Sequence, residues 1–144
     1  MANKGMMTGM RGVYLVAAEL TKLGWVVAPT SRSAIGADLL VTDNTCSRAW
    51  SVQVKTNSKP GTHWLLSKNA GKIKSDSHMY VFVDLMPNDE RPGFYIVPSR
   101  TVAEKTREVK NSTGTVWYRF DKHEVQPDDW RAFGRPESED EIEG

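Results

Sequence analysis

Two short segments carry the side chains that could do chemistry. Gly36-Ala37-Asp38 stands at the head of an apolar run, and Ser51-Val52-Gln53-Val54-Lys55 follows after a turn. Side chains on a strand alternate between its two faces. Val52 and Val54 should therefore face a core, together with Trp50, while Ser51, Gln53 and Lys55 share the opposite face. A carboxylate on one strand, with an amide and an ammonium on its neighbour, is a compact set of groups for metal-assisted phosphodiester chemistry.

Phosphodiester hydrolysis requires a nucleophilic water, relief of charge on the phosphoryl oxygens and stabilisation of the leaving oxygen. Mg²⁺ supplies the first two and prefers oxygen ligands with several waters retained. We expect Asp38 as the anionic ligand, with the Gln53 amide oxygen and the Val54 carbonyl as neutral ligands. Lys55 is suited to clamp the phosphate and orient the water rather than to act as general base. Because Gln53 adds no negative charge, we expect weakened metal binding and one ion rather than two.

Glu19 is a further candidate ligand. It lies in a helix predicted over residues 8–23, at the rim of the apolar stripe, from which it could reach the end of the sheet directly or through a metal-bound water. Each candidate also has a simpler interpretation. Asp38 after a glycine is typical of a turn, Gln53 and Lys55 of an exposed strand face, and Glu19 of a solvated helix surface. Their joint occurrence in this order favours a nuclease-type site.

The elements that must position these groups follow from hydrophobic periodicity and turn residues. The helix over 8–23 ends at Gly24. The segment 57–78 stays open, since any helix or strand in it is short. Strands are predicted at 25–28, 38–42, 49–56, 79–85, 94–97 and 115–120, with a helix over 100–109 and a short turn or helix at 128–130. This order predicts one α/β domain, residues 1–134, built around a mixed sheet.

Charge is distributed unevenly along the chain. The net charge is +1, but the last eight residues hold five acidic side chains and no basic one, so residues 1–136 carry +6. Residues 135–144 are therefore predicted to be an acidic, disordered tail. A segment without acidic residues begins at Lys55, and Trp64 within it could stack on a base or pack in the core. Four further lysines of this segment are candidates for binding nucleic acid: Lys59, Lys68, Lys72 and Lys74.

Several classes of protein are disfavoured by the sequence. No stretch approaches the roughly 20 apolar residues of a membrane span, and the first residues lack the apolar block of a secretory signal. A single cysteine, Cys46, fits a reducing cytoplasm. The three histidines show no zinc-ligand spacing with Cys46, and no glycine-rich phosphate loop is present.

With Asp38, Gln53 and Lys55 in this order behind a helix, the chain resembles the PD-(D/E)XK nucleases, the restriction-endonuclease-like superfamily. The resemblance covers roughly residues 10–85. Within the superfamily, the chain is similar to the branches of Holliday junction resolvases and methylation-dependent restriction enzymes. Asp38 matches the metal-binding Asp of the family, Lys55 its lysine, and Glu19 a helical Glu that many members use. Gln53 replaces the usual Asp or Glu, as in the branches with Gln-x-Lys, and Ala37 stands in place of Pro.

The resemblance implies a fold and an activity. The fold would be a restriction-endonuclease-like core, a mixed central sheet flanked by helices. The activity would be that of an endonuclease cutting DNA with Mg²⁺, for which Mn²⁺ substitutes, and small nucleases of this kind commonly act as homodimers.

Two other functions remain open on the sequence. The first is a catalytically inactive module that keeps the fold and binds nucleic acid, with Gln53 as its mark. The second is a regulatory factor that works through the acidic tail. The tail could also compete with DNA for the lysine-rich segment from Lys55 to Lys74.

Overall fold

Helix α1 (Lys4–Lys22) begins earlier than the apolar stripe predicts. The computed structural model describes residues 3–31 and 36–137. The Asn3 side-chain oxygen accepts a hydrogen bond from the Met6 N–H at 2.8 Å, which caps the helix. Gly24 follows its end with a φ of +97°, a left-handed conformation that favours glycine. The predicted start at residue 8 is therefore too late, because a polar cap and not the stripe sets the N-terminus.

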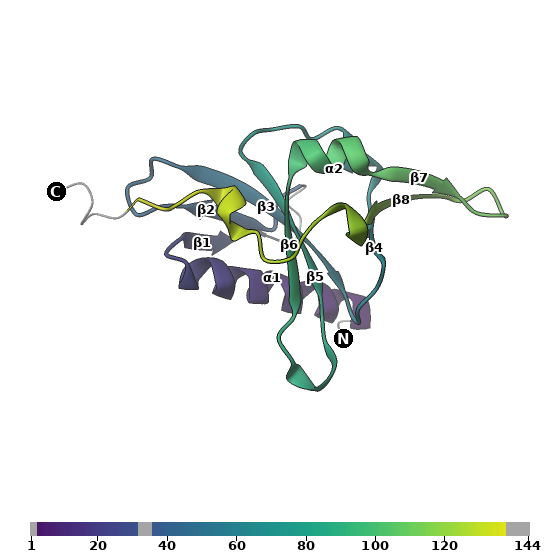
Figure 1. Ribbon diagram of the computed structural model, residues 1–144, viewed down its shortest axis with the longest axis horizontal. Helices are drawn as coiled ribbons and strands as arrows, with labels where there is room; N and C mark the ends of the chain where they lie inside the picture. Colours follow the sequence, from purple (N-terminus) through teal and green to yellow (C-terminus); the bar gives the residue numbers. More distant parts are fainter. Residues whose placement is uncertain (1–2, 32–35, 138–144) are drawn as a thin grey trace.

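A five-stranded sheet forms the centre of the molecule (Figure 1). Only β3 and β5 run parallel, and the other neighbours are antiparallel. All residues of β5 are buried, as its continuous apolar run predicts. The predicted mixed sheet is thus confirmed. In spatial order its strands are β1 (Val26–Pro29), β2 (Leu39–Thr42), β3 (Ala49–Asn57), β5 (His78–Asp84) and β6 (Gly93–Pro98).

Helix α1 covers one face of this sheet (Figure 1). Val16 and Leu20 of the helix are fully buried in one cluster with Val52 of β3. The helix approaches β3 closely at Gly12, where an added Cβ would collide with the Thr56 side chain. Glycine at this position therefore sets the distance between α1 and the strand that carries Gln53 and Lys55.

A second, three-stranded sheet covers the opposite face of the central sheet. It consists of β4 (His63–Leu66), β8 (Val116–Asp121) and β7 (Arg107–Lys110) in that spatial order, beside helix α2 (Ser99–Lys105). Aromatic side chains fill the space between the two sheets; Phe82 and Phe120 stack with ring centroids 4.8 Å apart. Short 3-10 helices complete the described chain at Lys68–Gly71, Pro87–Asp89, Lys122–Glu124 and Trp130–Phe133.

The helix predicted over residues 100–109 is correct only in its first part. Helix α2 ends at Lys105, and Thr106 takes an extended conformation while its N–H and hydroxyl both donate to Val102 O. Residues 107–110 then pair with β8 as strand β7. A partner distant in sequence decides this segment, so local periodicity could not separate strand from helix.

The described chain contains no helix that is long and apolar enough to cross a membrane. The predicted acidic tail falls largely outside the described residues, from position 138 onward.

The turn between β2 and β3 is held by a buried carboxylate, that of Asp43. It accepts the Ser47 N–H at 2.9 Å, the Ser47 hydroxyl at 2.8 Å and the Thr45 hydroxyl at 3.1 Å. Burial by itself would raise the pKa of Asp43, but these bonds and one from the Arg48 N–H lower it from 3.8 to about 2.

We expect Asp43→Asn to lower the free energy of unfolding most above pH 4. The ionised carboxylate stabilises the fold above its ordinary pKa, and this contribution is lost as the pH falls toward 2. Urea unfolding of both proteins at pH 6, 4 and 3 measures the difference, with Asp89→Asn as an exposed control. A difference that stays constant across this range would contradict the assignment.

Candidate active site

Asp38 stands where β2 and β3 begin to separate. Its N–H donates to Val52 O at 2.8 Å, and its Oδ2 accepts the Val54 N–H, also at 2.8 Å. The carboxylate thus takes the place of a backbone acceptor at the end of the ladder. Within the described residues its other oxygen, Oδ1, has no hydrogen-bond partner, and the side chain is half-buried. One carboxylate oxygen is therefore fixed and the other is available.

The Val54 carbonyl lies on the same edge of β3 as this carboxylate. In a strand the N–H and C=O of one residue project to the same edge, and the Val54 N–H projects to Asp38. The opposite edge faces β5, where the Ser51 N–H donates to Ser77 O. The carbonyl proposed as a ligand thus faces the Asp38 side, past the pair formed by Val52 and Leu39, the first residue of β2.

Gln53 and Lys55 project from the face of β3 opposite α1. Val52 and Val54 are buried beneath the helix, which confirms the predicted alternation along this strand. Gln53 and Lys55 are half-buried, and in the described structure neither side chain takes part in a hydrogen bond or an ion pair. Among residues 3–31 and 36–137, Lys55 therefore has no counter-ion.

The loop before Asp38 is closed by Thr30. Its N–H donates to Asp38 O at 2.9 Å, and its hydroxyl donates to Ala37 O at 2.6 Å. Gly36 has a φ of +82°, which glycine tolerates without strain. These contacts fix the backbone that presents the carboxylate, and no motif in the sequence indicates that Thr30 makes them.

The lysine-rich segment reaches this loop. A Cβ added to Gly36 would lie 3.2 Å from Ile73 Cδ1, so the chain around Ile73 packs against the loop that carries Asp38. Lys72 and Lys74 flank Ile73, which brings their charge to the neighbourhood of the site. Four lysines of the segment are exposed and have no ion pair in the part of the chain that is described: Lys59, Lys68, Lys72 and Lys74.

Trp64, proposed as a residue that stacks on a base, belongs to the core instead. Its side chain is 1% exposed and its Nε1–H donates to Val83 O at 3.0 Å. The ring lies against Phe82 and Tyr95. The prediction is wrong because the lysines around Trp64 in sequence suggested an exposed segment, whereas β4 turns this side chain inward.

A cavity of about 260 Å³ opens beside Asp38 and Val54 on the side of α1. The helix lines it with uncharged residues of its first three turns: Met6, Gly9, Met10, Val13 and Tyr14. Glu19 lies in the last turn and accepts an ion pair from Arg91 at 2.8 Å. The structure does not bring Glu19 to Asp38, and the helix face nearest the site supplies no carboxylate.

A larger groove of about 1070 Å³ adjoins this cavity along the N-terminal half of α1. Lys4 and Arg11 line it, with Arg11 held loosely to Asp89 at 3.6 Å. Neither residue is among the site residues predicted from the sequence. Their signal is that residues 1–18 hold two basic side chains and no acidic one.

His78, at the start of β5, is a further residue near the site that the sequence did not indicate. Its Nδ1 lies 2.6 Å from the hydroxyl of Ser51, the next residue on the Gln53 face of β3. Burial lowers the pKa of His78 below its ordinary value of 6.5, and the hydrogen bond with Ser51 offsets this only in part. The ring is therefore neutral at pH 7 and adds no charge to this face.

We call the place where Asp38 meets Val54 of β3 the β2–β3 junction. Its residues fit Mg²⁺ better than a soft metal. Among the described residues no three His, Cys, Asp or Glu side chains come together as a ligand group. One carboxylate oxygen of Asp38 lies at the edge of β3 that carries the Val54 carbonyl, and the Gln53 side chain projects from the face of β3 opposite α1. Mg²⁺ is commonly bound by one or two carboxylates plus waters and substrate phosphates, whereas zinc sites use three or four His, Cys or carboxylate ligands from the protein.

No protein-family model matches the chain, and no curated protein matches its sequence. Among solved structures, it is similar to Hjc, a Holliday junction resolvase of the archaeal hyperthermophile Archaeoglobus fulgidus. The TM-score is 0.51 at 11% identity, over 94% of this chain and 100% of that one. It is also similar to the bacterial homing endonuclease I-Ssp6803I, with a TM-score of 0.49 at 16% identity, over 99% of this chain and 92% of that one.

The chain has the restriction-endonuclease-like fold. Its mixed central sheet is flanked by α1 on one face and α2 on the other, as predicted, and a second sheet that was not predicted lies beside α2. At 11% identity the likeness to Hjc is one of fold.

Proposed function

We propose that this protein is a Mg²⁺-dependent DNA endonuclease whose site is the β2–β3 junction. The observation that carries the proposal is the arrangement of Asp38. One of its oxygens is fixed by the Val54 N–H, the other is free, and the Val54 carbonyl faces the same side. The fold supports the proposal, because the similar Hjc is a Holliday junction resolvase.

Each residue then has a separate task. Asp38 Oδ1, the Val54 carbonyl and the Gln53 amide would hold the ion, which when bound would supply an activated water and neutralise charge on the phosphate; Mn²⁺ should substitute. Lys55 would hold a phosphate oxygen and orient the attacking water. The exposed lysines from Lys59 to Lys74 would bind the DNA backbone next to the site.

A substitution of Lys55 tests the proposal with the smallest expected effect on folding. We expect Lys55→Met to cut DNA about 10²-fold more slowly at saturating Mg²⁺, because the charge on the phosphate is no longer stabilised. The matched control is Lys22→Met, an exposed lysine at the far end of α1. Cleavage of plasmid, duplex and four-way junction DNA on gels, with Mg²⁺ or Mn²⁺, measures the effect. Equal rates for both variants would exclude Lys55 from the site.

One observation favours a second function, a DNA-binding module without turnover. Asp38 is the only carboxylate among the residues that line the 260 Å³ cavity, and Gln53 adds no charge. If the wild-type protein binds these DNAs with a strong salt dependence and cuts none of them with either metal, the binding module is correct.

A further inference from the structure

The outer face of the second sheet carries groups that the proposed cleavage does not use. In β4 and β8, Trp64 and Phe120 point inward to the aromatic core. Their neighbours in each strand therefore point outward. We call this outer face the platform. It comprises His63 and Leu65 of β4, Trp117, Arg119 and Asp121 of β8, and Arg107 and Val109 of β7.

Apolar side chains on the platform are exposed. Trp117 is 46% exposed and Leu65 is 49% exposed, although both stand in regular strands. Buried tryptophans of this protein show the alternative, since Trp64 is 1% exposed. An exposed indole on a sheet surface is a plane on which another flat group can stack.

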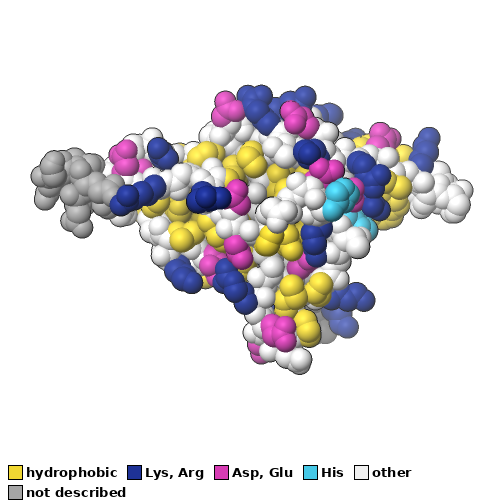
Figure 2. All heavy atoms as spheres, viewed as in Figure 1, with side chains coloured by type: hydrophobic (Ala, Val, Ile, Leu, Met, Phe, Trp, Pro, Cys, Tyr) yellow, Lys and Arg dark blue, Asp and Glu magenta, His cyan; other side chains and the backbone are white. Residues whose placement is uncertain are grey.

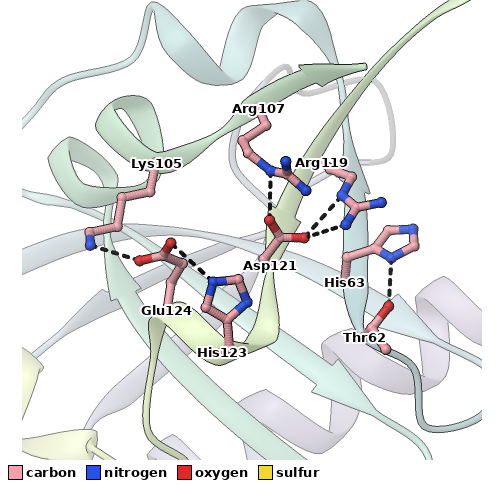
Figure 3. Close-up of polar contacts among 8 residues, drawn as sticks. All are labelled: Thr62, His63, Lys105, Arg107, Arg119, Asp121, His123 and Glu124. Carbon is pink, nitrogen blue, oxygen red and sulfur yellow. Dashed lines mark hydrogen bonds and ion pairs between the residues drawn. The ribbon is translucent and has the colours of Figure 1, made fainter. Parts of the chain in front are cut away.

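The two arginines of the platform are held in place by one buried carboxylate (Figure 3). Arg107 Nε donates to Asp121 Oδ2 at 2.7 Å, and Arg119 Nε donates to Asp121 Oδ1 at 2.9 Å. The Asp121 side chain is only 5% exposed, whereas those of Arg107 and Arg119 are 56% and 30% exposed. The carboxylate thus orients both guanidinium groups and remains covered, so further N–H donors face the solvent.

The charge of the platform is positive. Asp121 is the only acidic residue among those that form the platform, since Glu108 of β7 alternates to the other face. Two arginines, Arg107 and Arg119, lie against Asp121. Burial alone would raise the pKa of Asp121, but its bonds and charge interactions with Arg107 and Arg119 lower it, so the group is ionised and the trio carries +1. At the end of the molecule where β7 and β8 lie, Figure 2 shows Lys and Arg side chains together with acidic, hydrophobic and histidine ones.

We infer that the platform binds a single-stranded segment of DNA, with a base stacked on Trp117 and phosphates on Arg107 and Arg119. Stacking on an indole requires an unpaired base, and guanidinium groups match phosphate oxygens. The inference rests on the proposed function for the identity of the polyanion. It extends that function, because it assigns to the substrate an unpaired strand beside the duplex.

The platform and the proposed active site are connected through β3 and β4. The Asn57 side chain, at the end of β3, donates to His63 O at 2.9 Å, where β4 begins. This contact places the first residue of β4 beside the end of the strand that carries Gln53 and Lys55.

The test measures binding of a fluorescent 15-nucleotide oligo(dT) by anisotropy, in the Asp38→Asn background so that no cleavage interferes. We expect Trp117→Ala to bind the oligonucleotide about tenfold more weakly and Trp117→Phe to retain most of the affinity. Val26→Ala, at 46% exposure on β1, is the matched control and should bind normally. Arg107→Gln should reduce the slope of log affinity against log salt by about 0.7, whereas Lys22→Gln should not.

Two outcomes would contradict the inference that the platform binds single-stranded DNA. One is unchanged oligo(dT) affinity in Trp117→Ala. The other is a wild-type dimer in sedimentation experiments that Trp117→Ala dissociates, since the face would then belong to a second copy. These outcomes are separate from failure of the proposed function. If Asp38→Asn cuts DNA at the wild-type rate, the assignment of the active site is wrong. The binding measurements still show whether the platform binds single-stranded DNA.

Discussion

Asp38→Asn is expected to slow DNA cleavage by at least about 10²- to 10³-fold while the protein remains folded. The asparagine side-chain oxygen can still accept the Val54 N–H, as Oδ2 of Asp38 does at 2.8 Å. The variant therefore loses the negative charge and keeps the local structure. We expect the slower cleavage to persist at high Mg²⁺, because a neutral amide cannot replace the carboxylate of Asp38 at the β2–β3 junction.

The matched control is Asp89→Asn. Asp89 is 96% exposed and has a positive φ, a conformation that asparagine also adopts. Single-turnover cleavage of each variant, with the melting temperature measured alongside, separates chemistry from stability. A rate for Asp38→Asn within threefold of the Asp89→Asn rate would remove Asp38 from the mechanism.

Trp64→Ala is expected to lower the free energy of unfolding by about 3–5 kcal/mol. The side chain lies between the two sheets, contacts Phe82 and Tyr95, and donates to Val83 O at 3.0 Å. Truncation leaves a cavity and removes the buried hydrogen bond from the indole to Val83 O. Denaturant unfolding measures the change, and Trp117→Ala is the control, because an exposed tryptophan should cost far less.

A second substitution, Trp64→Phe, tests whether Trp64 belongs to the core and not to the DNA-binding surface. Trp64→Phe should stay folded and bind DNA as the wild type does, because the side chain never reaches solvent. Weakened DNA binding by folded Trp64→Phe, without loss of stability, would restore Trp64 to the DNA-binding surface.

The sequence was sufficient for the strands of the proposed site. β3 alternates over its length, and Val52 and Val54 are buried as its pattern requires. A sheet with one covered face imposes this period of two, so the common face of Gln53 and Lys55 could be predicted. The left-handed Gly36 and the turn after β2 are also local in origin.

What depends on distant partners could not be predicted. β4 has four residues, and its pairing partner β8 lies far along the chain. β7 likewise becomes a strand only against β8. Glu19 shows the same limit on a helix. Periodicity places it at the rim of the apolar stripe, but only tertiary structure decides that Arg91, and not Asp38, lies near it.

The parallel pairing of β3 with β5 has a consequence for how the protein can be divided. Parallel neighbours need a crossover, and here the crossover supplies β4, the edge strand of the second sheet. β4 is paired in turn by β8, from the C-terminal third of the chain. A fragment that stops after β6 would leave β4 without its partner and Trp64 without Phe120. We therefore expect the two layers to unfold as one cooperative unit, and a fragment that stops after β6 to be unstable.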